Sequence, residues 1–257
     1  MSRLWPDALE AGLFPGDCWL ARRKRKREVL AAVTDSLPSS ALLDGFGQCL
    51  TQAEGKWKGR AQLSIVVSDS IAAIAPLPWQ DGLNSAAEWQ GYAQLCFERL
   101  GHDIGTDWAM HVEYPRYGAT GLAYALPRPW MRSLLAKAEE KQMRVRRVLP
   151  VSAQAFCGIE TARSGLMIVL LFEATQHGAL VLENGVLLAR EVEPHTQSVA
   201  TTCRRLLARI LATRKAGEGQ PVHISWWAYK ELSFPDDVVK ALAIDAKVTQ
   251  IADGAWA

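Results

Sequence analysis

The sequence predicts an α/β protein in which two halves repeat one plan around mixed sheets. Leu166–Phe172 is a run of seven apolar residues, which has the length of a buried strand. Asn184-Gly185 joins the next two apolar segments, Gly178–Glu183 and Val186–Val192, and both residues tolerate the positive φ of a type I′ hairpin turn. After Ser198 the apolar residues recur with helical spacing, so a helix follows the three strands.

The rest of this second half continues with a strand, a short helix and a last strand. We expect these elements at Val222–Trp226, Pro235–Leu242 and Val248–Ile251. The resulting order of three strands, helix, strand, helix and strand resembles the ribonuclease H-like plan, which actin-like ATPases share.

The first 76 residues predict the same opening of strands, helix and strand, although Leu4–Phe14 shows no regular period. The basic run Arg22–Arg27 is expected at the solvated tip of a hairpin. Ser68-Asp69-Ser70 reads as a tight turn, with Ile71–Ala75 as the hairpin partner of the strand before it. The other expected elements are strands at Cys18–Ala21, Val29–Val33 and Leu63–Val67 and a helix from Ser40 to about Ala53.

The segment 84–150 predicts an insertion of helix, two strands, helix and strand. Ser85 and Glu88 form a capping box, which satisfies the first free amides of a helix that runs to about Leu100. We therefore expect a first half at 1–157, with an inserted subdomain at about 84–150, and a second half at 158–257.

Composition excludes several classes of protein. The formal net charge of +2 does not favour binding to nucleic acid, and the hydrophobic content of 49% is ample for a core. The five cysteines show no CxxC or Cys/His spacing, so they indicate reduced core thiols and no metal site. No apolar run reaches about 18 residues and no signal peptide precedes Leu13, so no membrane span is expected.

Three stretches carry a family resemblance. They are Leu63–Pro78 (LSIVVSDSIAAIAPLP), Met143–Phe156 (MRVRRVLPVSAQAF) and Leu166–Val192. In this layout the chain resembles the cytoplasmic actin-like proteins of bacterial envelope machines, namely PilM of type IV pili and the cytoplasmic domain of GspL of type II secretion. The resemblance implies an actin-like fold of two ribonuclease H-like halves, with a small inserted subdomain in the first.

The nucleotide-binding turns of such proteins are altered here. In an actin-like ATPase a carboxylate at the start of the second half helps to hold Mg²⁺, and small residues in the turn hold phosphate. The matching residues are Glu173 and Thr175, with Asp17 in the first-half hairpin, but neither turn is glycine-rich. Bulky side chains keep the backbone away from phosphate. We therefore expect no cofactor, with ATP and Mg²⁺ at these three residues as the alternative.

No catalytic constellation stands out. A ribonuclease H-type nuclease needs carboxylates that converge on two metals, and Leu166–Phe172 contains none. The five histidines are scattered, which indicates isolated core or surface residues. Nucleic-acid binding through Arg22–Arg27 is a further hypothesis. Seven basic residues between Arg128 and Arg147 form either a solvated face or a surface for an acidic partner.

Tryptophan points to a partner site. The stiff connection Pro76-Leu77-Pro78-Trp79 leads into the inserted helix, and Trp89 and Trp130 are expected near the same junction. Tryptophan is enriched at binding hot spots, although all three residues also suit an ordinary core. We predict that they border a groove for a short peptide.

The function that these features imply is a non-enzymatic scaffold. The resemblance implies a place in a type IV pilus or type II secretion-like assembly, in the cytoplasm and held at the inner membrane through partners. The expected partners are the cytoplasmic tail of a single-span inner-membrane protein and a pilus or secretion ATPase. The alternative is an ATP-binding actin-like ATPase that regulates such an assembly.

Overall fold

The computed structural model describes residues 7–22, 27–34, 41–57, 59–113, 117–158, 165–214, 222–230 and 232–251. The chain divides into two compact units. The first unit comprises the described residues of Met1–Ala72, Gly105–Ala109 and Ala125–Val151. The second comprises those of Ala73–Ile104, Met110–Tyr124 and Ser152–Ala257.

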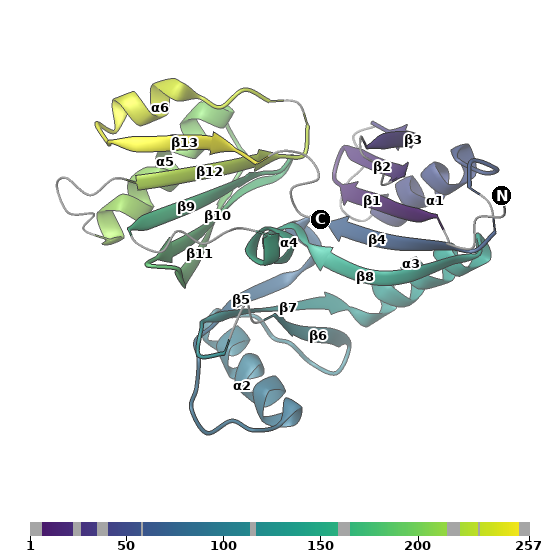
Figure 1. The fold of residues 1–257 in the computed structure, drawn as a ribbon. Coiled ribbons are helices and arrows are strands. Elements are labelled where there is room, and N and C mark those ends of the chain that lie inside the picture. Colours follow the sequence, from purple (N-terminus) through teal and green to yellow (C-terminus); the bar gives the residue numbers. More distant parts are fainter. Residues whose placement is uncertain are drawn as a thin grey trace. The chain divides into compact units, whose positions relative to one another are not determined.

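A five-stranded sheet forms the centre of the first unit (Figure 1). Its strand order is β3-β2-β1-β4-β8, antiparallel from β3 to β1 and parallel from β1 to β8. The strands are β1 Ala8–Phe14, β2 Asp17–Arg22, β3 Glu28–Val33, β4 Ala61–Val67 and β8 Met143–Pro150.

Helices α1 (Leu42–Gln52) and α3 (Arg128–Glu140) cover one face of this sheet. In β4, Leu63, Ile65 and Val67 are buried in the core under these helices, whereas the alternate residues are half-buried on the opposite face. The first sheet therefore has one apolar face and one face with polar side chains. The cap predicted for α1, Ser40, lies outside the described residues.

The second unit holds a sheet with the same plan, in the order β11-β10-β9-β12-β13 (Figure 1). Asn184 and Gly185 have φ values of 52° and 78°, which confirms the predicted hairpin turn between β10 and β11. The elements are β9 Leu166–Phe172, β10 Gln176–Glu183, β11 Val186–Pro194, α5 Val199–Arg214, β12 Val222–Ala228, α6 Asp236–Ala241 and β13 Ala246–Gln250. The predicted three strands, helix, strand, helix and strand are all confirmed.

A smaller sheet has the order β5-β7-β6 and is accompanied by α2. Ser85 Oγ accepts a hydrogen bond from the Glu88 amide at 3.2 Å, and the Glu88 carboxylate accepts one from the Ser85 amide at 2.8 Å. The predicted capping box is therefore present. The elements are β5 Ala73–Leu77, α2 Ala86–Arg99, β6 Trp108–Glu113 and β7 Gly121–Pro127.

Two sequence assignments differ from the structure. The predicted hairpin between Leu63–Val67 and Ile71–Ala75 is wrong, because β5 pairs with β7 and not with β4. Ser68 Oγ accepts a hydrogen bond from the Ser70 amide at 3.1 Å and caps a 3-10 turn at Asp69–Ile71, which turns the chain out of the first sheet. The strand β8, which the sequence placed in the insertion, pairs with β4 in the first sheet.

Helix α4 (Val151–Gly158) follows β8 directly, close to the predicted Ser152–Cys157. Most of the predicted linker at 158–165 and the basic residues 23–26 lie outside the described residues. Among the helices that the structure describes, none is both long and apolar enough to cross a bilayer.

Candidate functional site

An aromatic cluster lies in the second unit beside the three-stranded sheet. The Trp79 ring centroid is 5.2 Å from that of Trp89 and 4.5 Å from that of Tyr117. Trp89 also meets Tyr92 edge-on at 6.1 Å. Trp79 follows β5, Trp89 and Tyr92 are on the first turns of α2, and Tyr117 precedes β7, so three separate segments build this cluster.

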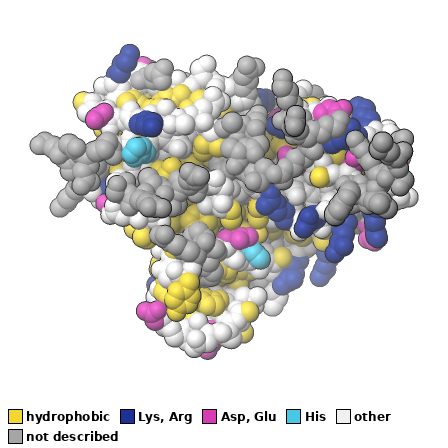
Figure 2. Space-filling model, in the orientation of Figure 1, with side chains coloured by type: hydrophobic (Ala, Val, Ile, Leu, Met, Phe, Trp, Pro, Cys, Tyr) yellow, Lys and Arg dark blue, Asp and Glu magenta, His cyan; other side chains and the backbone are white. Residues whose placement is uncertain are grey.

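The cluster is open to solvent on one side. Tyr117 is 88% exposed, whereas Trp79, Trp89 and Tyr92 are half-buried. Trp79 Nε1 donates to Asp81 Oδ1 at 3.0 Å, and Gln80 Nε2 donates to the Tyr92 hydroxyl at 3.3 Å. Hydrophobic side chains also reach the surface over the region of α2 and the three-stranded sheet (Figure 2). Rings fixed at their polar edges, with an apolar face left open, suit the side chains of a peptide.

Trp130 does not join this cluster. It lies on α3 and packs against the core of the first unit, while Trp79 and Trp89 belong to the second. Its indole nitrogen is buried and has no hydrogen-bond acceptor among the described residues. Of the three predicted tryptophans, the structure thus brings two together and adds Tyr117, which the sequence analysis missed.

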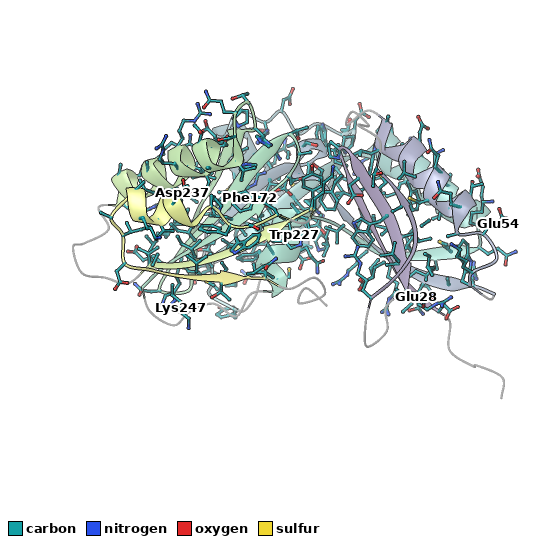
Figure 3. The ribbon with its side chains drawn as sticks, turned by 90° about the horizontal axis from the view of Figure 1, so that it is seen from above. Glu28, Glu54, Phe172, Trp227, Asp237 and Lys247 are labelled. Atoms are coloured by element: carbon teal, nitrogen blue, oxygen red, sulfur yellow. The ribbon has the colours of Figure 1, made fainter. Side chains whose placement is uncertain are left out.

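The turn between β9 and β10 contains the predicted nucleotide residues of the second half. Glu173 is buried, its amide donates to the Gln176 carbonyl at 3.0 Å, and Gln176 Nε2 donates to the Glu173 carboxylate at 3.4 Å. Thr175 is exposed, and its carbonyl accepts from the His195 amide at 2.9 Å. The end of the sheet beside this turn carries Phe172 of β9 and Trp227 of β12 (Figure 3). The turn is therefore closed by its own side chains and by His195.

Asp17 occupies the corresponding hairpin of the first unit. It is the first residue of β2, is half-buried and lies opposite Phe14, with Gly16 at φ 80° between them. Asp17 and Glu173 thus belong to different units. In the described part of the chain, no three His, Cys, Asp or Glu side chains are grouped to hold a metal ion.

Two histidines that the sequence suggests are isolated lie against each other. The rings of His177 and His195 are 4.6 Å apart, and Phe172 meets His177 edge-on at 4.9 Å. Burial lowers the pKa of His177 to about 4, with a smaller lowering from His195 and an opposing effect of the Gln176 backbone. Neither ring nitrogen of His177 has a well-formed hydrogen bond within the described ranges. The Asn184-Gly185 turn could have predicted this contact. A hairpin closed by that turn places residue 177 and residues 192–195 at the same end of the β10–β11 pair.

Known structures share this arrangement of elements. A Bacteroides thetaiotaomicron protein with an actin-like ATPase fold and unknown function is 11% identical, with a TM-score of 0.66 over 95% of this chain and 90% of its own. The PilM-PilN type IV pilus biogenesis complex matches at 12% identity and a TM-score of 0.62, over 95% of this chain and 88% of its own.

A third structure is the cytoplasmic domain of EpsL, an inner membrane component of the type II secretion system of Vibrio cholerae. It is 14% identical, with a TM-score of 0.54 over 97% of this chain and 92% of its own. The sequence matches no family model and no curated protein. At these identities the likeness concerns the fold, so the chain has the expected actin-like fold of mixed α/β sheets.

Proposed function

From the actin-like fold, we propose that this protein is a non-enzymatic scaffold of a type IV pilus or type II secretion-like machine. It binds the cytoplasmic tail of an inner-membrane partner, and it works in the cytoplasm beside that membrane. A pilus or secretion ATPase is its second expected partner.

The open aromatic cluster carries this proposal. Trp79 is half-buried, as a groove residue must be, and its ring contacts those of Trp89 and Tyr117. An extended peptide can place alternate apolar side chains against such a surface. Two of the similar structures support this reading, since one is a complex of PilM with PilN and the other comes from an inner membrane component.

The closed turn at Glu173 supports a role without catalysis. A phosphate-binding turn presents free backbone amides in a concave arrangement. Here the Glu173 amide already donates to the Gln176 carbonyl, so this amide is not free for phosphate. Opening the turn for phosphate would break this bond. We therefore propose that the second half keeps the fold of an actin-like ATPase but does not bind or hydrolyse ATP.

The test of partner binding uses three variants. Trp79→Ala and Tyr117→Ala remove aromatic area from the cluster, and Val29→Ala, at a residue 57% exposed in the first unit, is the matched control. Each is tested for capture of a single-span protein from membrane extract and then for affinity to a synthetic peptide of its cytoplasmic tail. We expect a loss of about 2 kcal/mol for Trp79→Ala, roughly thirtyfold, with the control unchanged.

Thermal melting separates binding from folding. Tyr117 is so exposed that Tyr117→Ala should leave the melting temperature unchanged while it weakens peptide binding. Unchanged capture by both cluster variants in their folded state would remove the cluster from the site.

Nucleotide binding is tested on its own. We expect a titration of fluorescent ATP with Mg²⁺ to show weak or no binding and no hydrolysis above background. A dissociation constant in the low micromolar range that is lost in Glu173→Ala would contradict the non-enzymatic assignment and favour the ATPase alternative.

A further inference from the structure

The last strand of the first sheet, β8, carries an irregularity in its pairing with β4. Gln62 lies opposite Arg144 and Leu63 opposite Val145, but Ser64 lies opposite Arg147. Arg146 is therefore the extra residue of a β-bulge. Without the bulge, strict alternation would place Arg147 on the same face as Val145.

The bulge gathers three arginines on one face of the sheet. Val145 and Val148 pack into the core under α1 and α3. Arg144 and Arg147 share the opposite face with Gln62 and Ser64, because residues in register point the same way. Arg146 reaches that face as well, since its Nη1 donates to Gln62 Oε1 at 3.1 Å. All three arginines are exposed.

These charges are largely uncompensated. Neither Arg144 nor Arg147 forms an ion pair within the described residues, and Arg146 bonds to a neutral amide. Arg60, exposed directly before β4, is likewise without an acidic partner in the part of the chain that the structure describes. Lys and Arg side chains gather over β8 and α3 in the space-filling view (Figure 2). The three like charges of β8 repel one another unless an anion lies among them.

We propose that this arginine row, Arg144, Arg146 and Arg147, binds an acidic extended segment of a second protein. Arg144 and Arg147 stand opposite residues two positions apart on β4, so they are separated by about 7 Å along the strand. The same spacing of about 7 Å separates side chains on one side of any extended chain. Carboxylates at alternate positions of a partner therefore match the guanidinium groups, which prefer planar carboxylate oxygens.

The shape of the row favours a linear acidic segment over a bilayer. The next strands of this face present neutral Gln62 and Ser64, and then Glu10 of β1. A planar anionic surface would meet that carboxylate, whereas a chain that runs along β8 avoids it. The bulge interrupts the regular hydrogen-bonding edge of β8, so a partner cannot pair along it as a continuous added strand. The arginine side chains therefore supply the affinity for the acidic segment.

Nucleic acid fits the row less well. Single strands bind through bases stacked on aromatic rings as well as through phosphate contacts. On this face of the sheet Phe14 is buried, and the half-buried Trp19 already has the Arg27 guanidinium 3.6 Å from its ring centroid. This surface belongs to the first unit and the aromatic cluster to the second, so a variant of one surface leaves the residues of the other unchanged.

The test uses a fluorescein-labelled peptide of about ten residues in which glutamate alternates with threonine, so that its carboxylates lie on one side when extended. Binding to the full chain is followed by fluorescence polarisation at low and high salt. The variant is Arg144→Gln with Arg147→Gln. The matched control is Arg99→Gln with Arg204→Gln, two exposed arginines of the second unit that remove the same charge.

We expect the β8 variant to weaken peptide binding about tenfold at low salt and the control less than twofold, with unchanged melting of both. No binding by the natural chain, or equal losses in variant and control, would overturn the proposal. Binding of phosphatidylglycerol vesicles and of a single-stranded oligonucleotide is measured in parallel. Tighter binding of either one than of the peptide, lost in the β8 variant, would also overturn it.

Discussion

The two five-stranded sheets share one strand order but have different surroundings. All seven residues of β9 are buried, so apolar side chains cover both of its faces. The matching strand of the first sheet, β1, carries an exposed Ala8 and a half-buried Glu10 on the face away from the helices. The second sheet is enclosed at its centre, around β9 and β10, and the first keeps a face on which charges can act.

This difference shows that topology and chemistry are set separately. Both sheets have the same strand order although the exposure of their matching strands differs. Burial beside β9 lowers the pKa of His177, whereas the open face of the first sheet carries a row of exposed arginines. The comparison leads to four predictions, from the largest expected effect to the smallest.

The largest effect is expected in acid, in the enclosed sheet. His177 has a pKa of about 4 when folded against 6.5 as the ordinary value, so the unfolded chain takes up a proton first as pH falls. Stability is unaffected above pH 6.5 and declines between pH 6.5 and 4, by about 3 kcal/mol in all. Urea unfolding at pH 7, 5.5 and 4 measures this loss. His177→Phe, which keeps a ring beside Phe172, should remove most of it. An equal acid loss in the variant would assign the effect to other groups.

Two glycines give the next test. A Cβ at Gly12 of β1 would lie 2.2 Å from the Trp19 ring, whereas one at Gly178 of β10 would meet Leu171 Cβ at 3.8 Å. Gly12→Ala must displace the indole and should lose about 2 kcal/mol of stability. Gly178→Ala should be neutral or stabilise by up to about 1 kcal/mol. In a Trp19→Ala background the cost at Gly12 should disappear, and its persistence there would show that the ring is not the cause.

A smaller effect is expected where α5 meets its sheet. Arg209 pairs with Glu193 at 2.8 Å and with Glu191 at 3.2 Å, but its side chain is 43% exposed. Arg209→Met should therefore lose only about 0.5–1 kcal/mol, and less at high salt. Phe46→Leu in α1, an apolar contact of the first core, serves as the control, because its loss should not depend on salt in this way.

Thiol reactivity gives the smallest effect, with no change in stability. Burial raises the pKa of Cys18 and of Cys203 to about 12 and that of Cys49 to about 11, whereas Cys157 is exposed. A thiol reagent should label Cys157 rapidly in the folded protein, and Cys157→Ser should abolish that reaction. In rising urea, mass spectrometry of Cys18 and Cys203 then reports which sheet opens first. Rapid labelling of either in the native state would contradict their burial.

The sequence predicts the fold well where local signals decide. The Asn184-Gly185 turn and the run Leu166–Phe172 suffice for the second half. The pairing of β5 could not be predicted, because a turn at Ser68 is compatible with a hairpin and with an exit from the sheet. For the same reason the sequence could not show that β8 pairs with β4, and we predicted it as part of the insertion. The division at 1–157 and 158–257 remains a prediction.

The candidate site was predictable only in part. The stiff Pro-Leu-Pro connection places Trp79 near Trp89, but Trp130 turns toward another core because α3 belongs to the first sheet. The arginine row depends on a one-residue bulge, and alternation alone divides Arg144 and Arg147 between two faces. The packing of Val145 and Val148 in the core sets this strand register, and no local sequence pattern indicates it.

The parallel pairing of β4 with β8 also bears on how the chain folds. Residues 68–142 lie between these two strands, so the first sheet closes a long loop, which slows folding. On a ribosome, β1 to β4 emerge well before β8 exists. During that interval β4 presents an unpaired edge, with Leu63, Ile65 and Val67 incompletely covered because α3 is also still missing. We therefore expect the nascent chain to depend on chaperones until residue 150 has left the exit tunnel.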